Sequence, residues 1–300
     1  MIPEKQLQAI LHLLDDPDEE VQQAVFARIL EYGPRAIQQL EKAWAKSEDE
    51  AQQERIETLI HRVHLTELST DFRNWNDADE PDLLQGAILL SRYAYPGLNT
   101  ELVIAQFERI RRNLWLEVNQ YLAPVEQINA FNAILYGYYR LQGQELSRNE
   151  PAHFFINTLL DSRVGNPYTL GVLYLAMCER LDVPLFAISV PQQFLFAYFD
   201  GFVPGVSDDD TDLLRHVRFF VDPVSGSIYT KADVANYLNR IKVPPSLNYL
   251  VPLSARAILR QMMAALARTY EQQEKTEKAE DIRRLRNLIR GEDDIPDEDD

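Results

Sequence analysis

The chain has 300 residues, of which 46% are hydrophobic, and a formal net charge of −17 at pH 7. This excess of acidic residues excludes a general role in binding nucleic acid or acidic membranes, because both are polyanionic surfaces. The opening residues show no signal-peptide pattern, and no apolar run approaches the ~20 residues that span a bilayer. Because a lone cysteine, Cys178, is typical of a reducing compartment, we expect a cytoplasmic protein without an internal disulfide.

The first 65 residues have the pattern of paired amphipathic helices. Asp16 and Pro17 precede acidic residues at a predicted helix start, and Gly33 and Pro34 mark its stop. Apolar residues recur at helical spacing on both sides of this stop. We therefore predict that residues 1–65 form HEAT-like helical hairpins, units that bury their apolar faces only against a neighbour.

The middle of the chain changes its periodicity. Residues 66–152 stay helical in pattern and are rich in aromatic residues, whereas residues 153–240 begin with two helical stretches around a Gly-Asn-Pro break. Three short runs rich in β-branched and aromatic residues follow, and they read LFAISV, QFLFAYF and VRFFVDP. A helix followed by antiparallel strands indicates an α+β fold that is predominantly helical, not an alternating βαβ fold.

The end of the chain returns to helical periodicity. Residues 241–290 predict a C-terminal extension with two amphipathic helices. Seven of the ten residues from 291 to 300 are acidic, so we expect a disordered tail.

The common signatures of nucleotide, zinc-protease and serine-hydrolase sites are absent from the sequence. The five histidines are scattered. His61 and His64 lie three residues apart on a predicted helix, a spacing compatible with a metal ion, but no third ligand is nearby in sequence, so we expect no metal site and no cofactor. Cys178 would lie about nine residues into its predicted helix, roughly 13 Å from the N-terminus that could activate a thiol. It is therefore interpreted as a buried structural residue.

A long segment of this middle region resembles a known family. It reads FINTLLDSRVGNPYTLGVLYLAMCERLDVPLFAISVPQQFLFAYF and is followed by RFFVDPVSG. This resembles the SirB-like branch of the transglutaminase-like superfamily, which reads N-x-V-L-E-x-R-x-G-N-P-I-S-L, R-L-G-L-P, L-P-x-H-F and D-P-x-x-G. The resemblance covers most of residues 66–288. It implies that residues 66–240 form a papain-like α+β core, flanked by the HEAT-like helices and the C-terminal helices.

The resemblance also implies where a catalytic triad would lie. In catalytic transglutaminase-like proteins a Cys at the start of the central helix is the nucleophile, a His on the next strand is its base, and an Asp orients the His. These positions fall at Tyr168 or Thr169, at Gln193 and at Asp222, so only the Asp is kept. Glutamine does not accept a proton near neutral pH, and a Thr hydroxyl without a base is a weak nucleophile. We therefore expect no catalytic residue and interpret the four positions as a vestigial triad.

Two interpretations of the vestigial positions stay open at this point. Gln193 and Asp222 either satisfy each other at strand ends, or they bridge to Thr169 in a degenerate pocket for a peptide or small ligand. Asn166, held extended by the following proline, is predicted to cap the helix. The possible cleft-lining residues are Asn166, Gln192 and Phe194.

The sequence thus predicts a cytoplasmic, non-catalytic transglutaminase-like protein that binds protein partners through its helical segments as a scaffold or regulatory module. The alternative is a hydrolase or acyltransferase with Thr169 as a non-standard nucleophile. An open cleft with Thr169, Gln193 and Asp222 in hydrogen-bond reach would favour a ligand-binding or catalytic site. A cleft filled by Tyr168 and Phe194 would favour the first prediction.

Overall fold

The computed structural model describes residues 9–10, 13, 18–119, 121–144, 150–200, 213–244 and 246–289. The chain divides into two compact units, Met1–Asn74 and Trp75–Asp300. The division falls near the end of helix α4 (Glu50–Asn76), and the predicted boundary at residue 65 lies within that helix. The predicted acidic tail, residues 291–300, lies outside the described residues.

The first unit contains α2 (Glu19–Tyr32), α3 (Pro34–Lys46) and most of α4. Asp18 caps α2 by accepting a 2.9 Å hydrogen bond from the Glu20 backbone N–H, and the predicted break at Gly33 separates α2 from α3. The helices enclose a buried apolar cluster of Ile10, Val25, Ile29, Ala36, Leu40, Ile56, Leu59 and Val63. The HEAT-like interpretation of this unit stays a prediction.

The second unit begins with a helical half around a central helix. Its elements are α5 (Leu83–Ala94), α6 (Thr100–Glu117), α7 (Pro124–Asn132), the π-helix η1 (Ala133–Tyr138), the 3-10 helix η3 (Pro151–Phe154), α8 (Ile156–Ser162) and α9 (Pro167–Arg180). Every residue of α9 from Thr169 to Cys178 is buried, and α9 contacts α5, α6, α8 and strand β3. It is the central, mostly buried helix that the sequence predicts.

A four-stranded antiparallel sheet follows α9, in the order β3-β4-β5-β6. Its strands are β3 (Leu185–Val190), β4 (Gln193–Phe199), β5 (Val217–Val221) and β6 (Ile228–Tyr229). A parallel pair, β1 (Gln142–Gly143) with β2 (Val164–Gly165), lies beside the helices. The predicted fold class, predominantly helical α+β with a small antiparallel sheet, is confirmed.

One face of the sheet packs on α9. The Phe196 ring lies 5.5 Å from that of Tyr174, measured between centroids. Phe194 approaches α9 where Gly171 has no side chain, since a Cβ there would lie only 2.5 Å from Phe194 Cε1. The aromatic residues of alternate β4 positions therefore fix the sheet against α9.

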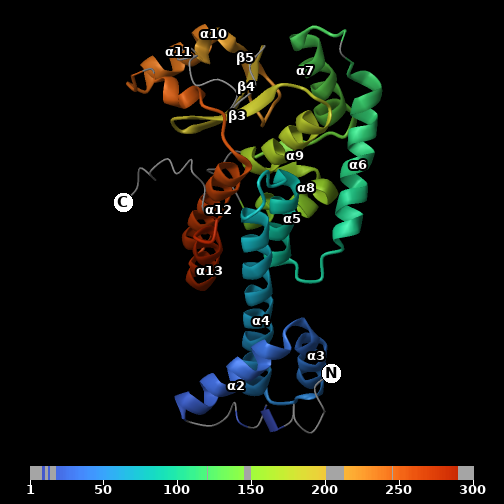
Figure 1. The fold of residues 1–300 in the computed structure, drawn as a ribbon, viewed down its shortest axis with the longest axis vertical. Helices are drawn as coiled ribbons and strands as arrows, with labels where there is room; N and C mark the ends of the chain where they lie inside the picture. Colours follow the sequence, from blue (N-terminus) through green and yellow to red (C-terminus); the bar gives the residue numbers. More distant parts are fainter. Residues whose placement is uncertain are drawn as a thin grey trace. The chain divides into compact units, whose positions relative to one another are not determined.

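The opposite face of the sheet is also covered. Leu195, Ala197 and Phe199 of β4 join a buried cluster with Val234 and Leu238 of α11 (Lys231–Arg240). Figure 1 shows the sheet with α11 and α10 (Leu213–His216) on one side and α9 on the other. Strand β4 is thus apolar on both faces because helices cover both.

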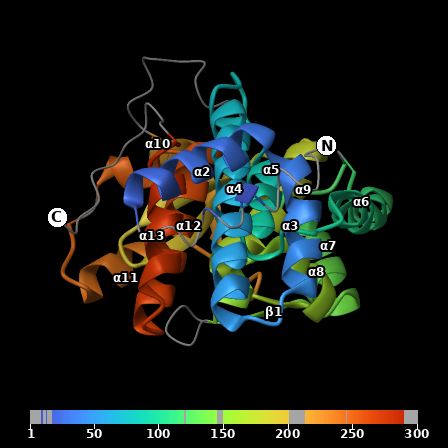
Figure 2. The same cartoon turned by 90° about the horizontal axis from the view of Figure 1, so that it is seen from below.

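The C-terminal part contains the 3-10 helix η4 (Leu247–Leu250), α12 (Ala255–Gln272) and α13 (Thr276–Arg286). Helices α12 and α13 lie side by side in both views (Figures 1 and 2). Tyr93 of α5 donates a 3.2 Å hydrogen bond to buried Asp281 and so links α13 to the helical half. No helix among the described residues is both long and apolar enough to cross a bilayer.

Candidate functional site

The side chain of Asn166 caps the start of α9. Asn166 lies in an extended conformation before Pro167, and its side-chain oxygen accepts a 2.9 Å hydrogen bond from the Thr169 backbone N–H. Asn166 is fully buried, so this amide is part of the interior of the domain. The predicted capping role of Asn166 is confirmed, and its side chain lines no open cleft.

Thr169 lies in the first turn of α9 and is fully buried. Its hydroxyl donates to the backbone carbonyl of His153 at 2.6 Å and lies 3.2 Å from Asn166 Oδ1. The imidazole of His153 is used elsewhere, because its Nδ1 accepts from the Glu150 backbone N–H at 3.4 Å. The Thr169 hydroxyl proton is therefore held by a backbone carbonyl and not by a base.

Two aromatic rings occupy the space beside this first turn. The rings of Tyr168 and Phe194 lie 4.9 Å apart between centroids, with their planes tilted by 39°. Phe194 is only 8% exposed. Burial raises the pKa of the Tyr168 hydroxyl above its usual range, although nearby Arg268 lowers it, so the phenol is neutral at neutral pH. The two rings therefore pack against each other beside the start of α9.

Gln193 lies on the other face of the sheet. It begins β4, directly after the turn of Pro191 and Gln192, and pairs with Val190. Gln192 is exposed and has a φ of +62°, which places it in the turn and not in a cleft. Because strand side chains alternate, Gln193 shares the α11 face with Leu195, whereas Phe194 faces α9.

The predicted bridge from Gln193 to Thr169 and Asp222 is therefore wrong. Among the described residues, no hydrogen bond joins the Gln193 side chain to either of them. Gln193 instead lines an open groove of about 450 Å³ beside α11, with Tyr229, Tyr237 and Arg240. The sheet itself separates this groove from the start of α9.

Asp222 is used by the turn that it opens. Its Oδ1 accepts from the Val224 backbone N–H and its Oδ2 from the Ser225 hydroxyl, both at 2.8 Å. The Asp222 backbone N–H also donates to the Ser227 carbonyl at 2.9 Å. The carboxylate thus stabilises an Asx-type turn and orients no imidazole.

The same turn is anchored by residues that the sequence reasoning missed. Asn132 Nδ2 donates to the Gly226 carbonyl at 2.7 Å, and the Tyr136 hydroxyl donates to the Pro223 carbonyl at 2.7 Å. Gly226 has a φ of +71°, and a Cβ there would lie 2.2 Å from Asn132 Oδ1. The glycine of D-P-x-x-G was the available signal, because it marks a turn that needs this backbone conformation and close approach.

The described residues form neither an activated thiol nor a metal site near these positions. Cys178 is fully buried, and burial raises the pKa of its thiol well above the usual range, which opposes thiolate formation. Over the described part of the chain, no group of three His, Cys, Asp or Glu side chains is placed to hold a metal ion.

A helix followed by antiparallel strands, with motif residues at the helix start and at the strand ends, matches a known family. The family model of the transglutaminase-like superfamily matches residues 101–264, more than half of the chain. The chain belongs to the transglutaminase-like superfamily. Curated relatives agree with the SirB-like resemblance of the sequence, which is confirmed.

Three of these relatives show how far the similarity extends. Protein SirB1 of Salmonella typhimurium strain LT2 is 26% identical over 113 residues, 38% of this chain and 42% of SirB1. A UPF0162 protein of Xylella fastidiosa strain 9a5c is 27% identical over 126 residues, 40% of this chain and 45% of that protein. F-box only protein 21 of Homo sapiens is 27% identical over 74 residues, 25% of this chain and 12% of that protein.

The chain spans less than half the length of the curated relatives it matches. No solved structure matches it. Within this transglutaminase-like domain, the four predicted triad positions are not joined to one another by described side-chain hydrogen bonds.

Proposed function

We propose that this transglutaminase-like domain is non-catalytic and acts in the cytoplasm by binding a protein partner. The observation that carries the proposal is the filled helix start, where Thr169 is buried against the His153 carbonyl and Tyr168 packs on Phe194. A nucleophile needs both a base and access for its substrate. This helix start offers neither, which supports binding over turnover.

The surface proposed for the partner is the solvent-facing side of α6, defined by Leu102, Ile104, Trp115 and Leu116. Trp115 and Leu116 are 63% and 72% exposed. Figures 1 and 2 both show α6 at the edge of its unit. Exposed large apolar side chains gathered on one element are typical of interaction sites, and aromatic residues are enriched in interface cores.

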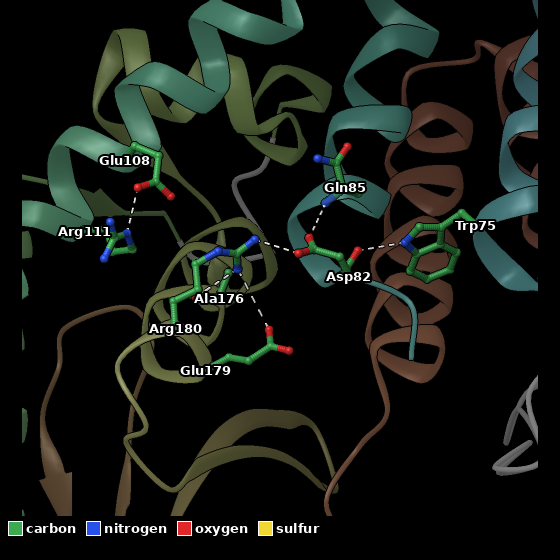
Figure 3. Close-up of polar contacts among 8 residues, drawn as sticks. All are labelled: Trp75, Asp82, Gln85, Glu108, Arg111, Ala176, Glu179 and Arg180. Atoms are coloured by element: carbon green, nitrogen blue, oxygen red, sulfur yellow. Dashed lines mark hydrogen bonds and ion pairs between the residues drawn. The ribbon is translucent and has the colours of Figure 1, made fainter. Parts of the chain in front are cut away.

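The charges along α6 indicate which kind of partner surface would fit it. Arg111 pairs with Glu108 at 2.7 Å (Figure 3), whereas Arg109 and Arg112 are exposed between the apolar residues. A partner surface with an apolar centre and an acidic rim would complement them. The proposal is therefore a protein partner that presents apolar side chains bordered by Asp or Glu.

Absence of catalysis is tested with electrophilic acyl and thiol probes on the full chain. The wild-type protein is expected to show only slow modification, at Cys178, and a Cys178→Ser variant is expected to show none. Rapid stoichiometric labelling that survives in Cys178→Ser and is lost in Thr169→Ala would instead establish the alternative, a hydrolase or acyltransferase that uses Thr169.

Binding is tested by isolating partners on immobilised protein and reconstituting the complex from purified components. Trp115→Ser combined with Leu116→Ser is expected to weaken that complex at least tenfold, because such anchors carry about 1–2 kcal/mol or more each. The matched control, Leu214→Ser with Val251→Ser, changes two other exposed apolar residues of the same unit and should leave affinity unchanged. Equal affinity of both double variants and the wild type would reject the α6 surface.

A further inference from the structure

A pocket of about 500 Å³ lies at the C-terminal end of α9. Its walls come from the segment before α5, the last turn of α9, the edge strand β3 and the start of α12. At 1.5 Å per residue, the two ends of the 14-residue α9 lie about 20 Å apart. The pocket is therefore separate from the predicted triad positions, and none of the triad residues lines it.

The floor of the pocket is apolar. Leu175 and Cys178 of α9, Leu185 of β3 and Ile258 of α12 line it, and all four are buried by the surrounding protein. Its volume falls in the range of small-molecule sites, roughly 300–1,000 Å³. A ligand that fills it must bring an apolar body, because the floor offers no charged partner.

The rim of the pocket is acidic. Glu179 and Asp182 line it and are exposed. Burial raises the pKa of Glu179 above its usual range, and the charges of Asp82 and Glu80 raise it further, while Arg180 lowers it. Both rim carboxylates also lie at the C-terminal end of α9, where the helix dipole is negative and disfavours anions. Negative potential therefore accumulates at the mouth of the pocket.

The neighbouring cation, Arg180, is engaged with other groups. Its Nη2 lies 2.6 Å from Asp82 Oδ2, and its Nη1 donates to the Ala176 carbonyl at 3.1 Å; Figure 3 draws both contacts. Its guanidinium also lies 4.9 Å above the centre of the Phe107 ring. The distance to Glu179 is 4.0 Å, at the limit of an ion pair. Arg180 thus pairs with Asp82 and is only at the limit of pairing with Glu179.

We propose that this pocket binds a small molecule with an apolar body and a cationic head group, such as a protonated amine. The apolar body occupies the floor between Leu175, Leu185 and Ile258. The head group lies at the rim, beside Glu179 and Asp182, where the protein supplies the opposite charge. This binding goes beyond the proposed partner surface on α6, and either proposal can fail without the other.

The test compares three ligands that share one apolar body and differ in charge. Purified full-length protein is titrated at pH 7 with 4-phenylbutylamine, 4-phenylbutanol and 4-phenylbutanoate, and binding is measured by calorimetry. The amine is expected to bind about fivefold or more tightly than the alcohol, and the carboxylate most weakly, because two partly exposed carboxylates each add a modest attraction. Equal affinities, or no binding of the amine, would overturn the proposal.

Variants locate the binding. Glu179→Gln combined with Asp182→Asn should reduce the affinity for the amine to that for the alcohol, and asparagine tolerates the φ of +54° at position 182. Ala255→Phe places a ring in the pocket and should abolish binding of both ligands.

The control, Glu117→Gln with Glu277→Gln, removes the same charge elsewhere in the unit and should bind the amine like the wild type. An amine affinity that is unchanged in the rim variant would reject the assigned site. Direct binding of a basic apolar peptide to a protein that does not bind the amine would reject a small molecule as the occupant.

Discussion

Replacing Phe194 with alanine is expected to destabilise the domain by about 3 kcal/mol, whereas replacing Gln193 is expected to change stability by less than about 0.5 kcal/mol. Phe194 is 8% exposed and contacts Tyr168 and Phe196, with ring centroids 4.9 and 5.9 Å away. Truncation of a buried Phe costs roughly 3–5 kcal/mol, and the position at the start of β4 favours the lower end because the site relaxes more easily there. Gln193 is exposed, and alanine there leaves no cavity.

The assay is urea unfolding of the full chain followed by circular dichroism, with midpoints and slopes compared between variants. Phe194→Leu serves as an intermediate control, because it keeps an apolar side chain and loses only the ring contacts. If Gln193→Ala were the costly change and Phe194→Ala the mild one, β4 would be shifted by one residue, since such a shift exchanges its two faces. That result would place Gln193 on the face toward Thr169. It would refute the conclusion that Tyr168 and Phe194 fill the space at the start of α9.

Four further predictions follow from the contacts. Gly226→Ala should lower the free energy of unfolding by about 1–3 kcal/mol, because of its positive φ and the close approach of Asn132, and thermal melting would show it. Tyr93→Phe should cost about 1 kcal/mol by removing the hydrogen bond to Asp281, measured by the same melt. Because the folded state raises the pKa of Glu179, protonation of this side chain favours folding. Its contribution to stability is present at low pH and is lost as the pH rises through the folded pKa. Glu179→Gln should therefore raise the melting temperature at pH 7 and change it little near pH 3. Amine affinity in the α9 pocket should show the opposite trend and fall as Glu179 becomes protonated, with the loss beginning at a higher pH than for an exposed glutamate of pKa about 4.3.

Local features of the fold could be predicted from the sequence because short-range physics decides them. Asn166 before Pro167 specifies a helix start, and the alternation of QFLFAYF, apolar at both sets of positions, indicates a strand covered on both faces. The structure agrees with both expectations. The pairing of Gln193 with Asp222 at the strand ends is not seen, because Asp222 accepts from Val224 and Ser225 of its own turn.

The orientation of Gln193 could not be predicted in the same way. A motif aligns residues in sequence, but the face to which a strand side chain points depends on the register with its neighbours and on the helix that covers each face. Val190 pairs with Gln193 across a two-residue turn, and this register directs Phe194 toward α9. The pocket at the end of α9 was missed for a related reason. Its walls at Pro81, Asp182 and Leu253 are far apart in sequence, so no spacing or motif signals them.

The arrangement at the start of α9 is therefore set by packing as well as by residue type. A histidine at position 193 would extend on the α11 side of the sheet and would not reach Thr169. Opening the cleft by removing Phe194 would still leave the Thr169 hydroxyl donating to the His153 carbonyl, with no base beside it. The Asp222 carboxylate would still accept hydrogen bonds from Val224 and Ser225. Because each position is held by a different set of contacts, no single substitution brings these residues together into one site.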